Sequence, residues 1–211
     1  MIFKNANDAY EHYYNHIMKF GYEINDTMEI INIGFLLSNP MDNHINNLER
    51  KWNTKYAELE WEWYLSGNPN ATEISKHAKI WLNNMDENNC VNSNYGYQWM
   101  RNNQIGYVVN ELKRDNTSRR AVISLYDGKE HNLYTKDTPC TLAITFSVRK
   151  ELLNMSVMMR SNDLVFGFCN DQYCFSKLQQ LIADKLELQI GTYFHFTNNL
   201  HIYKRHWNLN K

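Results

Sequence analysis

Proline and glycine are scarce in this sequence, with 3 and 8 among 211 residues. Interdomain linkers are often rich in both, and the chain shows no low-complexity segment or internal repeat. A composition of 43% hydrophobic and 21% charged residues is typical of a globular domain. We therefore predict a single domain over residues 1–211.

An excess of charge of one sign is also lacking. The 22 Lys and Arg residues nearly balance the 23 Asp and Glu residues, so the formal net charge is −1 at pH 7. A polymeric nucleic acid or an anionic membrane surface is held by many cations acting together. Neither is an expected partner, and any phosphate group must be bound by a few arginines in defined positions.

Long apolar runs are missing as well. The longest, such as residues 31–37, are shorter than the roughly 20 residues of a membrane-spanning helix. Residues 1–14 mix Lys4, Asp8 and Glu11 with apolar residues, so they do not resemble a cleavable signal. A cytoplasmic location is therefore the expectation.

Metal-binding and disulfide patterns are absent from the sequence. The four cysteines are too few for a disulfide scaffold in a chain of this length, and no two form a CxxC pair. His195, His201 and His206 are spaced by six and five residues, which fits no compact metal-binding pattern. Free thiols and no metal site are expected.

The pattern of apolar residues predicts a mixed α/β fold. Helices are expected over residues 7–20, 72–85, 105–114 and 176–188, and a long helix from the stripe Leu48, Trp52, Tyr56, Leu59 and Trp63. Strands are expected over residues 27–37, 121–126 and 191–203, with 141–148 and 152–159 forming a hairpin.

Cys140 follows an Asp-Thr-Pro sequence where a loop enters a predicted strand, a position that can hold a thiol at the mouth of a cleft. A nucleophilic thiol needs its pKa lowered by nearby positive charge, for which Arg149 and Arg160 are candidates. The alternative is that Cys140 is a small buried hydrophobic residue.

Other chemical groups cluster at two further places. Arg160, Ser161 and Asp163 place a guanidinium, a hydroxyl and a carboxylate together at the end of a predicted strand. Arg119 and Arg120 form a dibasic pair suited to bidentate phosphate binding. Each group could equally be an ordinary set of solvated charges.

Two glutamates, Glu60 and Glu62, flank the apolar stripe of the predicted long helix. Partial burial there would raise the pKa of a carboxyl group and suit it to proton transfer. Helical periodicity does not choose between the two, and side chains at the edge of a stripe often reach solvent.

Six short strings between about Glu58 and Trp207 resemble, in the same order, motifs of the thymidylate synthase superfamily. They are residues 59–65 with Gly67 and Asn70, residues 94–99, residues 118–120, the pair Pro139-Cys140, residues 160–163 with Gly167, and residues 201–203. The resemblance implies a large twisted mixed sheet covered by helices, with one face of the sheet packed in a homodimer.

The resemblance also implies a role for each matched residue. Cys140 would be the nucleophile, and Glu60 would activate water. The remaining residues would bind ligands: Arg160, Ser161 and the partner's Arg119 and Arg120 the 5′-phosphate, His201 and Tyr203 the sugar, Tyr95 the substrate, and Asp163 with Trp81 the pterin of folate. No arginine precedes Arg50, so Lys4 or Lys19 is expected in place of the phosphate-binding arginine that the family carries near its N-terminus.

One position departs from the synthases. After the Arg-Ser segment they read Gly-x-Pro-Phe-Asn, and that asparagine recognises uracil. Here Asp171 stands at the Asn position, four residues after Gly167. This substitution, with the strings around Tyr95 and Gly167, resembles the deoxycytidylate hydroxymethylases of virulent bacteriophages.

Hydrogen-bond matching explains why Asp171 would favour cytosine. Uracil presents an N3–H donor and an O4 acceptor, which an amide matches, whereas cytosine presents an N4 amino donor and an N3 acceptor. A carboxylate accepts from the amino group and, once N3 is protonated, from N3 as well. Uracil O4 would face a carboxylate oxygen with no proton between them, at a cost of about 1–3 kcal/mol. Alternatively, Asp171 is an ordinary acidic residue at a helix N-terminus.

The expected activity is therefore transfer of the methylene of 5,10-methylenetetrahydrofolate to C5 of dCMP. Cys140 would add to C6, and water would complete 5-hydroxymethyl-dCMP. A dCMP methylase or a dUMP-directed synthase of the same superfamily is the nearest alternative. A catalytically inactive nucleotide-binding or virion structural protein is a more distant one.

Overall fold

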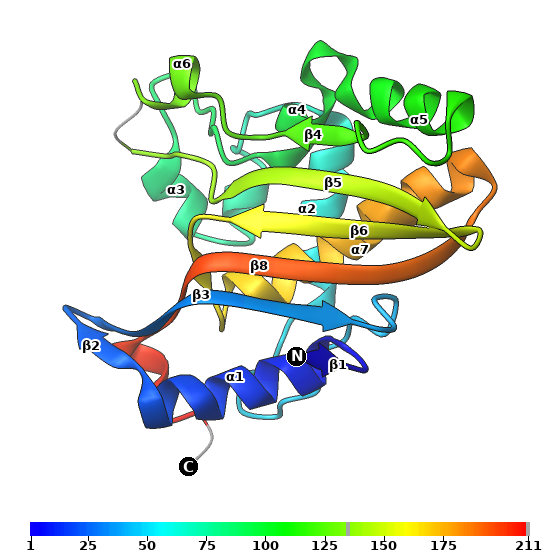
Figure 1. Cartoon of the computed structure of the whole chain (residues 1–211). Helices are drawn as coiled ribbons and strands as arrows, with labels where there is room; N and C mark the ends of the chain where they lie inside the picture. The colour runs from blue at the N-terminus through cyan, green and yellow to red at the C-terminus, as the bar shows by residue number, and fades with distance from the viewer. Residues whose placement is uncertain (134–135, 210–211) are drawn as a thin grey trace.

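The computed structural model describes residues 1–133 and 136–209 and is built around one large mixed sheet. Its strands run in the order β1-β3-β8-β6-β5-β4, with β2 paired to β3 and β7 paired to β8 (Figure 1). Their bounds are β1 Ile2–Phe3, β2 Tyr22–Ile24, β3 Thr27–Leu37, β4 Val122–Ser124, β5 Thr141–Arg149, β6 Leu152–Met159, β7 Asn162–Asp163 and β8 Gln189–Tyr203.

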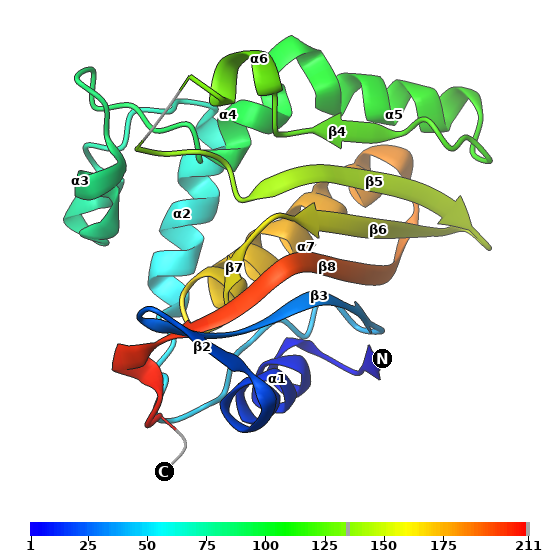
Figure 2. The same cartoon turned by 60° about the vertical axis from the view of Figure 1, so that its left-hand side comes forward.

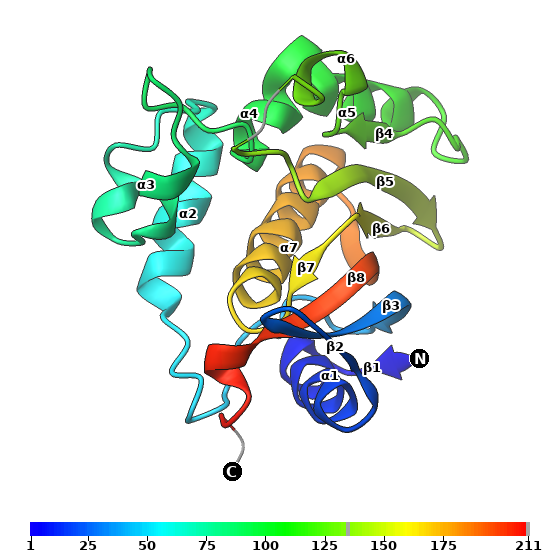
Figure 3. The ribbon, with the colours of Figure 1, turned by 90° about the vertical axis from the view of Figure 1, so that its left-hand side faces the viewer.

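Helices cover one face of this sheet. They are α1 Ala6–Phe20, α2 Thr54–Ser66, α3 Ile80–Asn84, α4 Tyr95–Met100, α5 Gln104–Arg114, α6 Gly128–His131 and α7 Gly167–Leu186. Seen along the strands, α7 and α2 lie on one side, and the opposite face of β5, β6 and β8 carries no described helix (Figure 3). The mixed α/β class with a large helix-covered sheet is confirmed.

The long strands follow the sequence pattern closely. β3 pairs antiparallel with β8 from Thr27↔Tyr203 to Leu37↔Tyr193, and β8 pairs parallel with β6. β5 and β6 form the predicted antiparallel hairpin, in which Ile144, Phe146 and Val148 are buried as their alternation requires.

The predicted long helix through Leu48 and Trp52 is wrong at its start. Helix α2 begins at Thr54, because the Asn53 side chain accepts a hydrogen bond from the Tyr56 amide and caps the helix there. Leu48 is 84% exposed, and Trp52 is instead held outside the helix by its bond to Asn170. The helix ends at Gly67, whose φ of 62° is left-handed.

The helix predicted over residues 72–85 is broken. A 3-10 turn, Ile74–Lys76, precedes the short α3, and the turn between them lets Trp81 pack edge-on against Trp63 with ring centroids 5.0 Å apart. These contacts make a small separate core of Ala71, Ile74, Trp81, Met85 and Val91. Tertiary packing has therefore overridden local helical preference.

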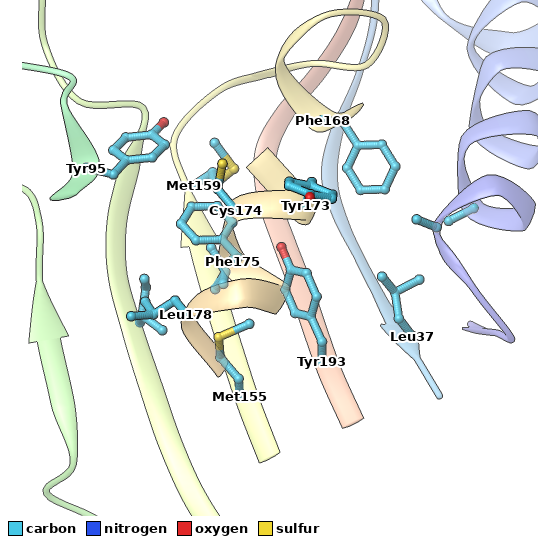
Figure 4. Close-up of a cluster of buried hydrophobic side chains, with 14 of the residues drawn as sticks. Leu37, Tyr95, Met155, Met159, Phe168, Tyr173, Cys174, Phe175, Leu178 and Tyr193 are labelled. Atoms are coloured by element: carbon cyan, nitrogen blue, oxygen red, sulfur yellow. The ribbon is translucent and has the colours of Figure 1, made fainter. Parts of the chain in front are cut away.

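Helix α7 begins at Gly167 rather than at the predicted residue 176. Phe168 and Phe175, both fully buried, extend the apolar face of the helix toward its N-terminus. Figure 4 shows them with Leu178 against Met155, Met159 and Tyr193 of the sheet. The predicted helix, which began at residue 176, left Asp171 ahead of its first turn. In the structure Asp171 lies inside the helix.

Helix α4 was not predicted, nor was the short α6. Asn94 caps α4 by accepting from the Tyr97 amide at 2.7 Å. The helix packs so closely on α2 that a Cβ at Gly96 would lie 1.8 Å from the Tyr64 carbonyl oxygen. Only glycine fits at that contact.

Candidate active site

A cavity of about 910 Å³ opens where α2 and α3 face the start of α7. Figure 2 shows this arrangement, with β7 and the end of β8 beside the first turn of α7. All predicted site residues except Arg119 and Arg120 line the cavity: Glu60, Trp81, Tyr95, Cys140, Arg160, Ser161, Asp163, Asp171, His201 and Tyr203. Residues from seven segments of the chain therefore converge on one space.

Cys140 lies in this cavity immediately before β5. The Arg160 guanidinium is fixed beside it, donating to the carbonyls of Pro139 at 3.0 Å and Thr138 at 2.8 Å. Burial raises the pKa of the Cys140 thiol to about 11, and the charge of Arg160 opposes that rise. The thiol is therefore protonated near neutral pH and has to lose its proton before it can attack.

The structure distinguishes between the two glutamates of α2. Glu62 is exposed, whereas Glu60 is buried and accepts a hydrogen bond from the Tyr64 hydroxyl on Oε1 at 3.0 Å. Burial raises the pKa of Glu60 to about 7. Its other carboxyl oxygen, Oε2, is buried and has no hydrogen-bond partner among the described residues. A carboxyl with a pKa near 7 can both accept and donate a proton.

Asp171 lies in the second turn of α7 and shares the cavity with Cys140 and Glu60. Its Oδ2 accepts a hydrogen bond of 2.7 Å from the Asn162 side-chain amide. Burial, followed by the nearby Glu60 carboxyl, raises the pKa of Asp171 well above its usual range. The Asp171 carboxyl in turn raises the pKa of the Cys140 thiol.

The end of β8 supplies two aromatic side chains to the cavity. His201 Nδ1 lies 2.8 Å from Asn199 Oδ1, and its ring is 5.1 Å from that of Tyr203. Burial lowers the pKa of His201, so the ring is neutral near pH 7 and can hydrogen-bond a hydroxyl group.

Two arginines in the cavity wall were missed by sequence reasoning. Arg50 and Arg205 lie over the Phe166 ring, 4.8 and 5.6 Å from its centroid. Neither belongs to a recognisable motif, and only the fold brings residues 155 positions apart together. The predicted substitutes Lys4 and Lys19 do not line this cavity.

Three further residues shape the remaining walls. Trp81 donates from Nε1 to the Tyr56 hydroxyl at 2.8 Å, which fixes the plane of its ring. Asp163 accepts from the Val165 amide at 2.8 Å and so shapes the turn before α7. Tyr95 stacks on Phe175 with centroids 5.5 Å apart.

Arg119 and Arg120 lie outside the cavity, exposed in the connection between α5 and β4. The Ser118 hydroxyl donates to Glu111 at 2.6 Å and accepts from the Arg120 amide, so the connection is tied to α5. Neither arginine lines the cavity.

The four cysteines are free thiols, as expected. Among residues 1–133 and 136–209, no three His, Cys, Asp or Glu side chains cluster in a way that could hold a metal ion. Within the same ranges, no helix is long and apolar enough to cross a membrane.

Comparison with known proteins agrees with this architecture. The family model described as thymidylate synthase matches residues 8–211. The deoxycytidylate 5-hydroxymethyltransferase of Enterobacteria phage T4 is 31% identical over 199 residues, 87% of this chain and 78% of that protein. The thymidylate synthase of Bacillus mojavensis is 29% identical over 165 residues, 74% of this chain. The match spans 58% of that synthase's length. The chain belongs to the thymidylate synthase family.

Proposed function

We propose that the protein is a deoxycytidylate 5-hydroxymethyltransferase, which converts dCMP to 5-hydroxymethyl-dCMP. The observation that carries this proposal is the position of Asp171, whose carboxyl lines the same cavity as the Cys140 thiol. A carboxylate acceptor matches the amino group of cytosine and repels O4 of uracil. The similarity to the phage T4 enzyme supports the same substrate.

Cys140 begins the proposed reaction by adding its sulfur to C6 of the pyrimidine, which makes C5 a carbon nucleophile. The charge that develops on the ring is stabilised by Asp171, which holds the protonated N3. C5 attacks the methylene of the folate, and loss of the C5 proton with departure of tetrahydrofolate leaves an exocyclic methylene on C5. Glu60 then takes a proton from a water molecule that adds to this methylene. Departure of the Cys140 sulfur releases the hydroxymethylated nucleotide.

The methylene would come from 5,10-methylenetetrahydrofolate, which supplies an electrophilic one-carbon unit when bound. The residues present fit such a second ligand, because the cavity lies near the upper end of the size range of small-molecule sites. Trp81 has its ring plane fixed by Tyr56 and would stack on the pterin. Asp163, in the turn before α7, would accept hydrogen bonds from it.

The 5′-phosphate would be bound by Arg160 and Ser161, with His201 and Tyr203 holding the sugar. The exposed Arg119 and Arg120 would complete the phosphate site of a second subunit, because they do not reach their own. This arrangement requires a homodimer, packed through the uncovered sheet face. No polymeric nucleic acid and no membrane is involved in this proposal, and the reaction would take place in the cytoplasm.

Product mass tests the proposal directly. The protein is incubated with dCMP or dUMP and methylenetetrahydrofolate, and the product nucleotide is weighed. A gain of CH2O on dCMP is the expected result, whereas a gain of CH2 identifies a methylase. The similarity to thymidylate synthases favours a dUMP-directed synthase as the second candidate, and methylation of dUMP alone would establish it.

A non-catalytic role is tested separately by the release of tritium from C5 of dCMP. Release in the wild type that is lost in Cys140→Ser supports covalent catalysis at C6. Equal release in the variant would remove Cys140 from the mechanism. No release in either protein would favour a nucleotide-binding or virion structural role.

A further inference from the structure

Asn162 is a buried residue that none of the steps above uses. It lies in β7 and is 3% exposed, and its register is fixed by pairing with Leu200 of β8. Its side-chain amide donates to Asp171 Oδ2 at 2.7 Å. A Cβ at Gly167 would lie 3.0 Å from the Asn162 nitrogen and 3.3 Å from Asp171 Oδ2, so the pair is tightly enclosed.

The orientation of the amide depends on the charge of Asp171. Asn162 Oδ1 is buried and has no hydrogen-bond partner among the described residues. If the amide were turned round, this oxygen would face a carboxylate oxygen, which is repulsive. The observed bond is therefore formed best when Asp171 is ionised and Oδ2 is an acceptor.

Ionisation of Asp171 decides which base it can pair with. A neutral carboxyl offers one O–H donor and one acceptor, the same pair that an asparagine amide offers. It could therefore donate to O4 of uracil and accept from N3–H. It could also bind neutral cytosine, donating to N3 and accepting from the amino group. A carboxylate has no such donor for uracil.

The surroundings of Asp171 favour its neutral form. The titratable groups that face it are Tyr56, Glu60 and Tyr64 of α2, Tyr95 of α4, Cys140, Asp163 of β7 and Tyr193 of β8, with the cysteines of α7 itself. None of these carries a positive charge. Burial and Glu60 raise the pKa of Asp171, and the hydrogen bond from Asn162 lowers it.

We propose that Asn162 is a specificity-determining positioning residue, which holds Asp171 as a carboxylate so that the cavity accepts cytosine and rejects uracil. This proposal rests on the proposed function. It adds that the residue at position 171 is not sufficient, and that its neighbour on β7 selects the form that discriminates.

Asn162→Ala tests the proposal, and Asn43→Ala is its matched control. Asn43 is also buried, at 4% exposure, and donates to a side chain of α7, Ser176 Oγ, at 2.8 Å, outside the cavity. Equilibrium binding of dCMP and dUMP to the full chain is measured at several pH values. Circular dichroism confirms that each variant is folded.

In Asn162→Ala, dUMP binding should strengthen by about tenfold at slightly acidic pH, the effect of one hydrogen bond to a charged group. Affinity for dCMP should change little, because a neutral carboxyl and neutral cytosine carry the same number of protons as the charged pair. The preference for dCMP should return as pH rises and Asp171 ionises. The wild type and Asn43→Ala should keep their preference across this range.

Equal weakening of both nucleotides in Asn162→Ala would indicate a merely structural role and overturn the proposal. If that variant does not fold, Asn162→Leu keeps a side chain of similar size but removes the donor. It should also strengthen dUMP binding, and an unchanged preference would again overturn the proposal. A wild type that prefers dUMP would instead refute the proposed function itself.

Discussion

The Tyr64 hydroxyl donates to Glu60 Oε1 at 3.0 Å, from one turn further along α2. Burial raises the pKa of Glu60, whereas this hydrogen bond and the Tyr56 hydroxyl lower it, and the outcome is a pKa of about 7. Glu60 therefore gains or loses its proton near neutral pH.

Tyr64→Phe should therefore move the pH dependence of the reaction. Loss of the donor raises the pKa of Glu60, so the rise of the rate with pH should shift upward by about one pH unit. The measurement is the rate of product formation from dCMP against pH. Tyr173→Phe, which removes a hydroxyl bonded to Glu58 of the same helix, should leave the profile in place. A profile unchanged in Tyr64→Phe would show that Glu60 does not set it.

Asp171→Asn should reverse base preference. An amide restores the donor and acceptor pair that matches uracil, so selectivity should move toward dUMP by roughly tenfold to a hundredfold. Competition binding of the two nucleotides measures this change. An unaltered preference would contradict the base-pairing argument for Asp171.

The exposed arginine pair can be tested by mixing subunits. Arg119→Ala with Arg120→Ala should be inactive, as should Cys140→Ser, because each lacks one part of every site. A mixture of the two inactive proteins should regain activity, since a heterodimer contains one site with both parts intact. Failure of mixing to restore activity, with heterodimers shown by mass spectrometry, would place the arginines outside the site.

His195 should make stability depend on pH. It is fully buried, Tyr193 Oη lies 2.8 Å from Nδ1, and burial lowers its pKa from 6.5 to about 3. Between pH 6.5 and 3, His195 therefore binds a proton in the unfolded chain but not in the folded chain. The contribution of His195 is present above pH 6.5 and is lost as pH falls toward 3.

Urea unfolding at a series of pH values measures this effect. Between pH 6.5 and 3, the free energy of unfolding should fall less in His195→Gln than in the wild type, by an amount on the order of a few kcal/mol. Identical pH slopes in the wild type and the variant would show that another group controls acid stability.

Alternation was sufficient to predict β5, in which Ile144, Phe146 and Val148 are buried, and an abundance of β-branched and aromatic residues was sufficient to predict β3 and β8. The start of α2 was not predictable from periodicity. Trp52 continues the apolar stripe, yet its indole bonds to Asn170 of α7, a contact 118 positions away in sequence. Similarly, the helix was predicted only from residue 176, whereas the packing of Phe168 extends α7 to Gly167.

The candidate site also contains residues that the sequence identifies and residues that only the fold brings together. Cys140 and Arg160 were identifiable because they stand in short strings of distinctive chemistry. Asn162 and Arg205 were not, because their significance depends on where β7 and β8 end relative to α7. Motif spacing predicts candidate groups for a reaction, whereas the neighbours of those groups emerge only from the assembled fold.

The contact of Gly96 with the Tyr64 carbonyl joins two walls of the cavity backbone to backbone. With no side chain between them to change rotamer, α2 and α4 can be displaced only as a single unit. Glu60 and Tyr95, one on each helix, therefore keep a constant spacing whatever occupies the cavity. Adjustment to ligands of different size must arise in the other walls, and the Glu60 carboxyl keeps its alignment with the Tyr95 ring stacked on Phe175.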